Sequence, residues 1–143
     1  MYQRKSTVKV MLDDGAFVPV RAHSDDAGMD LLAMSDFDVP PYGRVVHDTG
    51  VHVAIPRGYV GDVKSKSGLM TKHGITTDGT VDCGFTGSIR VTLFNNSSVR
   101  FEVKRGNKIA QLVIKQIITP DVELVDSLED TERGANGFGS TGK

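Results

Sequence analysis

Several residue types are scarce in this chain of 143 residues, and each scarcity excludes a class of protein. A single cysteine, Cys83, allows no internal disulfide framework, so stability must come from one sizeable hydrophobic core. Lys and Arg total 17 against 18 Asp and Glu, which gives a formal net charge of -1. This balance argues against stable nucleic-acid binding, which needs a basic face, but it leaves room for a locally basic pocket.

Long apolar runs are missing too. No run approaches the roughly 18 residues that a membrane helix needs, and the first residues, MYQRKSTVKVMLDDG, lack the apolar stretch of a signal peptide. We therefore expect a cytoplasmic protein with no membrane partner. The length predicts a single β domain over residues 1–130, followed by a flexible arm over residues 131–143.

Short β-branched runs between turn residues are what the sequence has in abundance. Residues 88–97 are the clearest case, because Ile89, Val91 and Leu93 alternate with polar side chains. Similar runs cover residues 6–12, 17–23, 44–55, 59–66, 100–108 and 108–119. The pattern predicts an all-β sandwich, jelly roll or barrel, in which only residues 69–74 and 127–132 have room for a helical turn.

The segment DGTVDCGFTGSIRVTL is the most informative for chemistry. It places one acid, Asp82, and one ring, Phe85, just before a strong strand. Its glycines let the backbone approach a ligand closely, because glycine has no side chain to block it. The residues alone leave two interpretations open, a hairpin with an exposed Asp and a core Phe, or a catalytic loop.

Three other segments hold polar groups that need partners. Lys66, Ser67 and Gly68 in KSKSGLM combine an ammonium, a hydroxyl and backbone N–H groups, which suit either an anion site or a solvated turn. Asp30 lies among apolar residues, where an acid is costly unless it caps a turn, is paired or is functional. Gln111 lies inside an apolar run. It is either a core amide whose hydrogen bonds are satisfied within the chain, or a residue that contacts a ligand.

Two kinds of site are not indicated. The four histidines show neither HxH nor HExxH spacing, and there is no second cysteine, so we expect no protein-bound zinc. No GxSxG elbow is present, and Cys83 has no local reason to be an activated nucleophile.

The chain ends in TERGANGFGSTGK, which has no helix or strand period. One arginine, one ring and the neighbouring hydroxyl residues Ser140 and Thr141 lie there among glycines. By itself the segment reads as a disordered end, but it also suits a lid that closes on phosphates.

Five segments, in order, resemble the motifs of the trimeric deoxyuridine triphosphate nucleotidohydrolases (dUTPases). They are AGMDLLA, KSGLM, GTVDCGFTGSIRV, GNKIAQLVI and RGANGFGSTG, spread from residue 27 to residue 142. The resemblance implies a homotrimer of β jelly-roll (β-clip-like) subunits with active sites at the interfaces. It also implies hydrolysis of dUTP to dUMP and pyrophosphate with Mg²⁺. That reaction keeps uracil out of DNA and supplies dUMP for thymidylate synthesis.

The resemblance also implies a role for individual residues. Asp82 matches the acid that orients the attacking water, and Asp30 matches an acid that reaches the metal through water, since the triphosphate holds most of the Mg²⁺. Phe85 matches the ring on the deoxyribose, while Arg133 and Phe138 match the arm residues that close on phosphate and uracil. The residues expected to contact substrate are Lys66, Ser67, Gly68, Thr80, Val81, Phe85, Arg90, Gln111, Arg133, Phe138, Gly139, Ser140 and Thr141.

The chain departs from the usual motifs at three places. Lys66 stands where the family usually has arginine, which keeps the charge but loses the bidentate fork. Phe85 stands where a tyrosine is usual, which keeps the steric wall without the hydroxyl. Residues 74–80, GITTDGT, are shorter than in many relatives and lack the amide side chain that often helps to read uracil.

Other functions remain open from the sequence. One is a dUTP-responsive regulatory protein of the same fold that binds a protein partner. A related deoxycytidine triphosphate deaminase would need an extra acid, for which no motif is visible. A carbohydrate-binding jelly roll is a further alternative, and release of pyrophosphate would separate these classes from a dUTPase.

Overall fold

The computed structural model describes residues 6–142, so residues 1–5 of the expected domain and Lys143 of the expected arm lie outside the described residues. Within that range no helix is long and apolar enough to cross a membrane. The elements are β1 (Lys9–Leu12), β2 (Gly28–Leu32), β3 (Phe37–Val39), β4 (Arg44–Asp48), β5 (Val51–Ala54), β6 (Tyr59–Lys64), α1 (Ser67–His73), β7 (Ile75–Thr76), β8 (Asp78–Val81), β9 (Arg90–Asn95), β10 (Phe101–Val103) and β11 (Lys108–Gln116).

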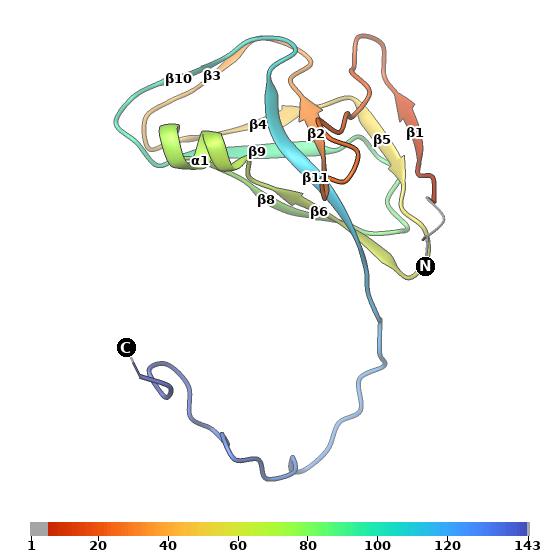
Figure 1. Cartoon of the computed structure of the whole chain (residues 1–143), viewed down its shortest axis with the longest axis vertical. Helices are drawn as coiled ribbons and strands as arrows, with labels where there is room; N and C mark the ends of the chain where they lie inside the picture. Colours follow the sequence, from red (N-terminus) through yellow and green to blue (C-terminus); the bar gives the residue numbers. More distant parts are fainter. Residues whose placement is uncertain (1–5, 143) are drawn as a thin grey trace.

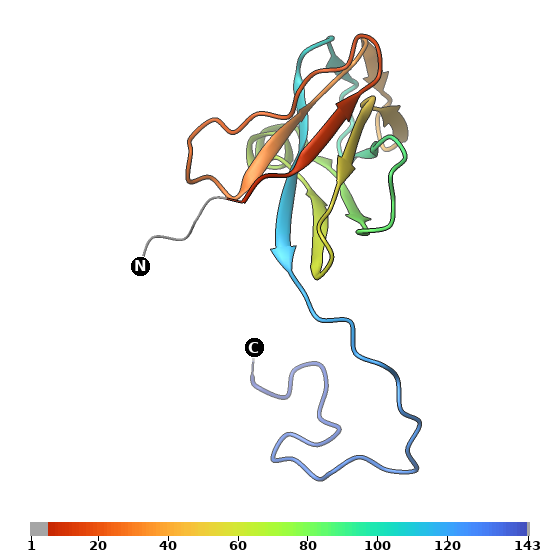
Figure 2. The same cartoon turned by 90° about the vertical axis from the view of Figure 1, so that its right-hand side faces the viewer.

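The strands pair antiparallel and form two larger and two smaller sheets (Figures 1 and 2). One larger sheet has the order β2-β11-β6-β8, and the other has the order β4-β9-β7. The pairs β1-β5 and β10-β3 complete the domain. The all-β jelly-roll fold expected from the sequence is confirmed.

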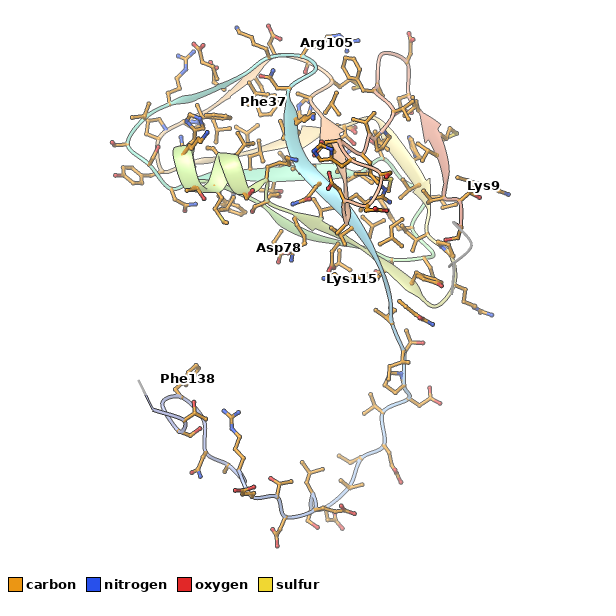
Figure 3. All side chains as sticks on the ribbon, in the orientation of Figure 1. Lys9, Phe37, Asp78, Arg105, Lys115 and Phe138 are labelled. Carbon is orange, nitrogen blue, oxygen red and sulfur yellow. The ribbon has the colours of Figure 1, made fainter. Side chains whose placement is uncertain are left out.

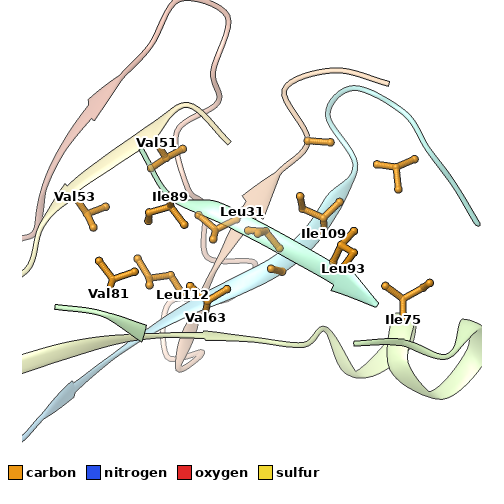
Figure 4. Close-up of a cluster of buried hydrophobic side chains, with 14 of the residues drawn as sticks. Leu31, Val51, Val53, Val63, Ile75, Val81, Ile89, Leu93, Ile109 and Leu112 are labelled. Carbon is orange, nitrogen blue, oxygen red and sulfur yellow. The ribbon is translucent and has the colours of Figure 1, made fainter. Parts of the chain in front are cut away.

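The hydrophobic core lies between the two larger sheets (Figure 4). The alternation expected in β9 is confirmed, because Ile89, Val91 and Leu93 are at most 2% exposed while Arg90 faces solvent. Val63 of β6 and Leu112 of β11 bury their side chains from the opposite sheet. Burial of this kind stabilises a domain by about 25 cal/mol for each Å² of apolar surface removed from water.

Two expected strands take another form. Residues 17–23 make only one isolated bridge, between Val20 and Asp30, and Pro19 removes a ladder donor within that run. Residues 44–55 form two strands, because the chain turns at Gly50, whose φ is 67°. A positive φ of this size suits glycine, which has no Cβ to clash.

The one helix forms where the sequence left room for it. α1 ends at Gly74, which has a φ of 67° and donates its N–H to the carbonyls of Leu69 and Met70. This is the left-handed glycine stop common at helix ends. The second candidate, residues 127–132, contains no helix.

The last strand ends at Gln116, and residues 117–142 contain neither helix nor strand. They extend away from the β domain and curve back at a distance from it (Figures 1 and 2). Several large apolar side chains of this segment are exposed, namely Ile118, Val122, Leu124, Leu128 and Phe138.

Candidate active site

A buried acid links three strands of the larger sheet. Asp30 of β2 is 3% exposed, and its carboxylate accepts a hydrogen bond from the Lys66 ammonium, just beyond β6. The other carboxylate oxygen lies 3.2 Å from Nζ of Lys108, the first residue of β11. These groups meet because β11 lies between β2 and β6 in the sheet. Asp30 is therefore paired within a strand, and the interpretation of it as a turn cap is wrong.

Two opposing influences act on Asp30. Burial is the largest single influence and raises the pKa of its carboxyl group. The hydrogen bonds and positive charges of Lys66 and Lys108 together outweigh burial, so the pKa lies below its ordinary value of 3.8. The carboxylate is thus ionised at neutral pH. With two ammonium groups for one carboxylate, the cluster keeps a net positive charge.

Gln111 lies beside this cluster on β11. Its side-chain Nε2 donates to the Ser65 carbonyl at 2.9 Å, so it is a satisfied amide within the chain. Gly28 makes room for it, since a Cβ at Gly28 would lie 2.2 Å from Oε1 of Gln111. Gln111 also lies in register with Asp30 of β2 and with Lys64 of β6. The first, second and fourth motifs therefore meet at one end of the sheet.

A basic hollow of about 300 Å³ opens next to the cluster. Ser67 and Gly68 begin α1, and both are exposed. A Cβ at Gly68 would meet nothing within 4 Å, so packing within one chain does not require glycine there. The hollow is lined by Lys66, Gly68, Leu69, Lys72, His73 and Lys108. Its cationic lining suits an anionic ligand such as a polyphosphate.

The third motif forms an exposed loop between β8 and β9. Asp82 follows β8 directly and is exposed, and its carbonyl accepts the Phe85 N–H at 3.1 Å, which closes a turn. The Phe85 ring is 47% exposed, so the interpretation of it as a core residue is wrong. The ring lies against Gly87, where a Cβ would stand 2.6 Å from its Cζ.

This loop borders an open cleft of about 530 Å³. Four residues expected to contact substrate line it together, namely Thr80, Val81, Phe85 and Arg90. Val63, Gly79, Gly87, Ser88 and Ile89 complete the lining. The cleft has the size of a small-molecule site, with a mostly uncharged wall and one arginine.

The end of the loop is held firmly by the turn between β4 and β5. Asp48 accepts a hydrogen bond from the Ser88 hydroxyl and another from the Gly50 N–H at 2.9 Å. The Ser88 bond and then the Gly50 bond lower the pKa of Asp48, although burial opposes them. The Ile89 N–H also donates to the Val51 carbonyl at 2.8 Å. Arg90 therefore leaves the loop from a fixed position.

The basic hollow and the Asp82 loop lie at opposite ends of the β6–β8 pair. Lys64 pairs with Asp78 at one end, and Gly61 pairs with Val81 at the other. Three residues of strand separate these levels, about 10 Å at the usual rise of 3.3 Å. Lys66 lies beyond the first end and Asp82 beyond the second, so one chain does not bring them together.

The arm residues lie apart from both the basic hollow and the cleft. Phe138 is fully exposed and far from the β domain (Figure 3). The arm nevertheless folds on itself, because Arg133 Nε donates to the Asn136 carbonyl at 2.9 Å. Arg133, Ser140 and Thr141 then face one shallow hollow, while Gly139 forms a turn with a φ of 78°.

No group of three or more His, Cys, Asp or Glu side chains that would suit a metal ion occurs among residues 6–142. Asp30 already uses both oxygens for lysines. Each carboxylate oxygen can accept a second hydrogen bond, so a metal-bound water still fits there. This donor set suits a Mg²⁺ that arrives with a polyphosphate, since Mg²⁺ commonly uses few protein ligands and keeps its waters.

Comparison with known proteins identifies the family. The dUTPase family model matches residues 14–142, which is most of the chain. The chain belongs to the dUTPase family. All five motifs lie within the matched residues or at their edge, so the resemblance expected from the sequence is confirmed.

Similar dUTPases come from distant organisms. A probable deoxyuridine 5'-triphosphate nucleotidohydrolase of Schizosaccharomyces pombe is 47% identical over 132 residues, which cover 92% of this chain and 94% of that protein. The enzyme of Gloeothece citriformis is 46% identical, with 92% of each chain covered. Among solved structures, the Staphylococcus bacteriophage 80alpha dUTPase with dUPNHPP has a TM-score of 0.87 at 31% identity, and the match covers 97% of this chain and 100% of that one.

Three contacts around this dUTPase site were not expected from the sequence. Lys108 binds Asp30, Asp48 holds Ser88, and His52 contacts the carbonyl of Thr86. Lys108 carried a visible signal, since it is the cation within the fourth motif, GNKIAQLVI. The other two residues lie in ordinary strand sequence, so only the fold reveals their partners.

Proposed function

We propose that this chain is a dUTP diphosphatase, which hydrolyses dUTP to dUMP and pyrophosphate. The observation that carries the proposal is the exposed Asp82 carboxylate beside the cleft lined by Thr80, Val81, Phe85 and Arg90. The family and its relatives' activity agree with that reading. The single exposed thiol, Cys83, suits a reducing compartment, so we place the reaction in the cytoplasm.

Asp82 acts on the attacking water. As an exposed carboxylate it accepts a hydrogen bond from water and orients it toward the α-phosphorus, in line with the leaving pyrophosphate. The turn between Asp82 and Phe85 fixes this carboxylate relative to the ring. Water, base and nucleoside are thus held by one short loop.

The basic hollow binds the phosphates. Lys66 and Lys108 share one carboxylate, so their excess positive charge is available to the triphosphate. Ser67 and Gly68 present a hydroxyl and backbone N–H groups at the same edge, and Gln111 supports the turn through the Ser65 carbonyl. Mg²⁺, carried by the triphosphate, would neutralise its oxygens and align the leaving group, with Asp30 reached through a water.

Selectivity for a deoxyuridine nucleotide comes from the third-motif loop. The Phe85 ring forms a wall that a ribose 2′-hydroxyl would meet. Backbone groups of residues 80–90 read the uracil edge and leave no room for a thymine methyl group. Because residues 74–80 contain no amide side chain, backbone groups have to recognise the uracil.

A complete site needs more than one copy of the chain. The Lys66 hollow and the Asp82 loop occupy opposite ends of the β6–β8 pair, whereas a single triphosphate must reach both. The exposed apolar side chains between β11 and the arm, such as Leu124 and Leu128, also need a surface to cover them. A homotrimer satisfies both demands, because each site takes its parts from neighbouring subunits.

The arm then closes the site. Arg133, Ser140 and Thr141 face one hollow of the arm and would bind phosphate oxygens, with Gly139 supplying the turn. The exposed ring of Phe138 would cover the uracil. Closure excludes water other than the nucleophile, which protects the reaction from side chemistry.

A regulatory role is a second candidate. A structural relative, the Staphylococcus bacteriophage 80alpha dUTPase, is described among phage dUTPases that control transfer of virulence genes. Binding of a dUTP-responsive protein partner would be an addition to hydrolysis.

The test is a panel of dUTP, dTTP, UTP and dCTP with Mg²⁺, scored for pyrophosphate. We expect release from dUTP and at least ~100-fold lower kcat/KM for the others, because a clash or an unpaired polar group costs a few kcal/mol. Equal rates on dUTP and UTP would refute the role given to Phe85.

A further inference from the structure

The loop that carries Asp82 and Phe85 has one anchor in its middle. Its end is fixed through Ser88 and Ile89, and Val81 pairs with Gly61 at its start. Between these points lie residues 82–87. Within the described part of the chain, they make one hydrogen bond to a residue outside the loop. It joins His52 Nδ1 to the Thr86 carbonyl, at 2.7 Å. Thr86 lies directly between Phe85 and Gly87, the two residues that shape the ring wall.

His52 is itself held from the other side. It lies on β5 opposite Met11 of β1, and its Nε2 is 2.9 Å from Oδ1 of Asp13, just after β1. The side chain is 18% exposed, so the ring is partly covered and its two nitrogens are both in contact with acceptors. The imidazole thus bridges the N-terminal strand and the third-motif loop.

Both partners of His52 are acceptors. A backbone carbonyl and a carboxylate oxygen have no proton to donate, and a neutral imidazole has one N–H donor and one lone pair. Only the doubly protonated ring donates to Thr86 and Asp13 together. In the neutral ring, one lone pair must face an oxygen, and that contact is repulsive.

We propose that His52, as the imidazolium, is a positioning residue that holds the Phe85 wall and the Asp82 carboxylate in place through the Thr86 carbonyl. The inference rests on the proposed dUTP hydrolysis for its effect on rate, but the anchor itself is a property of the folded chain. His52 does not contact substrate in this account, since Thr86 and Asp13 occupy its two nitrogens.

The charges around His52 support the protonated form. The bond to the Thr86 carbonyl raises the pKa of His52 most, followed by the bond to Asp13, and the charges of Asp13 and Asp48 add to them. Partial desolvation acts in the opposite direction. Lys9 of β1 is the cation that lines the same hollow as His52.

The sign of the pH dependence follows from this shift. Because the folded pKa lies above the ordinary value of 6.5, the anchor is complete below that value. It is lost as the pH rises through the folded pKa. The loop should therefore be best ordered below pH 6.5, and should loosen as the pH rises through the folded pKa of His52.

The first test compares kcat/KM for dUTP, with Mg²⁺, between the intact protein and His52→Gln from pH 5.5 to 9.5. Glutamine has one donor group and one acceptor group and, like neutral imidazole, carries no charge. We expect a deficit of about 3- to 10-fold at pH 6, which is modest because the bond is partly solvated. The deficit should shrink toward 1 at pH 9.5. The ratio of the two enzymes cancels any ionisation that both share.

Two more variants sharpen this test. Asp13→Asn removes one charge that favours imidazolium, so the pH at which the anchor is lost should move down. His23→Gln is the matched control, because His23 is exposed and its ring makes no hydrogen bond within the described part of the chain. It should follow the intact protein at every pH. A deficit for His52→Gln that is absent, or constant with pH, would overturn the proposal.

The second test needs neither nucleotide nor metal. Amide signals of Thr86 and Gly87 in ¹H–¹⁵N spectra of the free protein should titrate together with the His52 ring, with a midpoint above 6.5. Amides that ignore the His52 titration would also overturn the anchor. If the protein fails to hydrolyse dUTP but these amides follow His52, the proposed function fails while the anchor stands.

Discussion

The Phe85 ring lies directly on Gly87, two residues along the same loop, at a place where a Cβ would stand 2.6 Å from the ring carbon Cζ. No side chain other than hydrogen fits between the ring and this backbone without a shift. The wall that we assign to sugar selection therefore depends on a glycine that need not touch substrate. The effect of a substitution at either residue therefore has to be interpreted together with the other residue.

Gly87→Ala should displace the ring and weaken selectivity. The added methyl group forces Phe85 away from its present position, so the ratio of kcat/KM for dUTP over UTP should fall by about 10-fold, which corresponds to roughly 1.4 kcal/mol. Phe85→Ala should lower this ratio at least as much. In a Phe85→Ala background, Gly87→Ala should change little more, because the clash no longer exists. Additive losses would show that Gly87 acts in another way.

Asp82→Asn should lower turnover and leave the fold unchanged. The substitution keeps size and hydrogen bonding but removes the carboxylate, so we expect kcat to fall about 10²- to 10⁴-fold. Melting temperature and affinity for a dUTP analogue should change little, because Asp82 is exposed. Near-complete retention of activity would show that this acid does not act on the attacking water.

Lys66→Met should destabilise the domain at neutral pH and make its stability less dependent on pH in acid. The variant leaves buried Asp30 with Lys108 alone, and we expect a loss of about 1–3 kcal/mol in the free energy of unfolding at pH 7. Since the pKa of Asp30 is lowered in the fold, its pairing stabilises the protein above 3.8 and is lost as the pH falls through the folded value. In the variant the pKa of Asp30 is lowered less, so less of the free energy of unfolding depends on ionised Asp30.

Lys64→Met provides the control for that experiment. Lys64 is the exposed last residue of β6, two residues before Lys66, and forms no ion pair among residues 6–142. Its replacement should alter stability by less than about 0.5 kcal/mol, the usual range for surface changes. Equal effects of the two substitutions, measured by urea unfolding at pH 7 and at a pH below 3.8, would argue against the Asp30 cluster.

Removal of residues 131–143 should separate folding from catalysis. The described residues of this arm, 131–142, are all exposed, so the melting temperature of the free protein should barely change. Hydrolysis of dUTP should fall sharply. Arg133→Ala alone should cost about 10- to 100-fold in kcat/KM, the value of a charged hydrogen bond to phosphate. A truncated protein with full activity would mean that the segment is not a lid.

The fold was predictable where strands alternate. β9 shows this, because Ile89, Val91 and Leu93 follow the period of a half-buried strand. β2 was missed as a strand, since it contains Gly28 and Asp30, which have low strand propensity. Both positions are set by contacts with β11 and the turn after β6, which lie far along the chain.

The candidate site was predictable mainly through its motifs. The residues of each motif were identified, but their partners were not: the Asp30 pairing with two lysines depends on the order β2-β11-β6. Phe85 shows the same limit, because hydrophobicity alone cannot tell a core ring from a wall exposed to a ligand. The roles of the individual site residues stay predictions until they are tested by substitution.

The most direct measurement of the central claim, that one active site is built from different copies, is co-expression of Asp82→Asn with Lys66→Met. If each site takes Lys66 from one subunit and Asp82 from another, random trimers contain about a quarter of intact sites. We predict dUTP hydrolysis well above that of either variant alone. The control mixes the intact chain with a chain that carries both substitutions. If sites are shared between chains, about a quarter of the sites in these mixed trimers should be intact. If each site lay within one chain, about half would be intact. No gain from the first mixture, in trimers that have formed normally, would contradict the shared site.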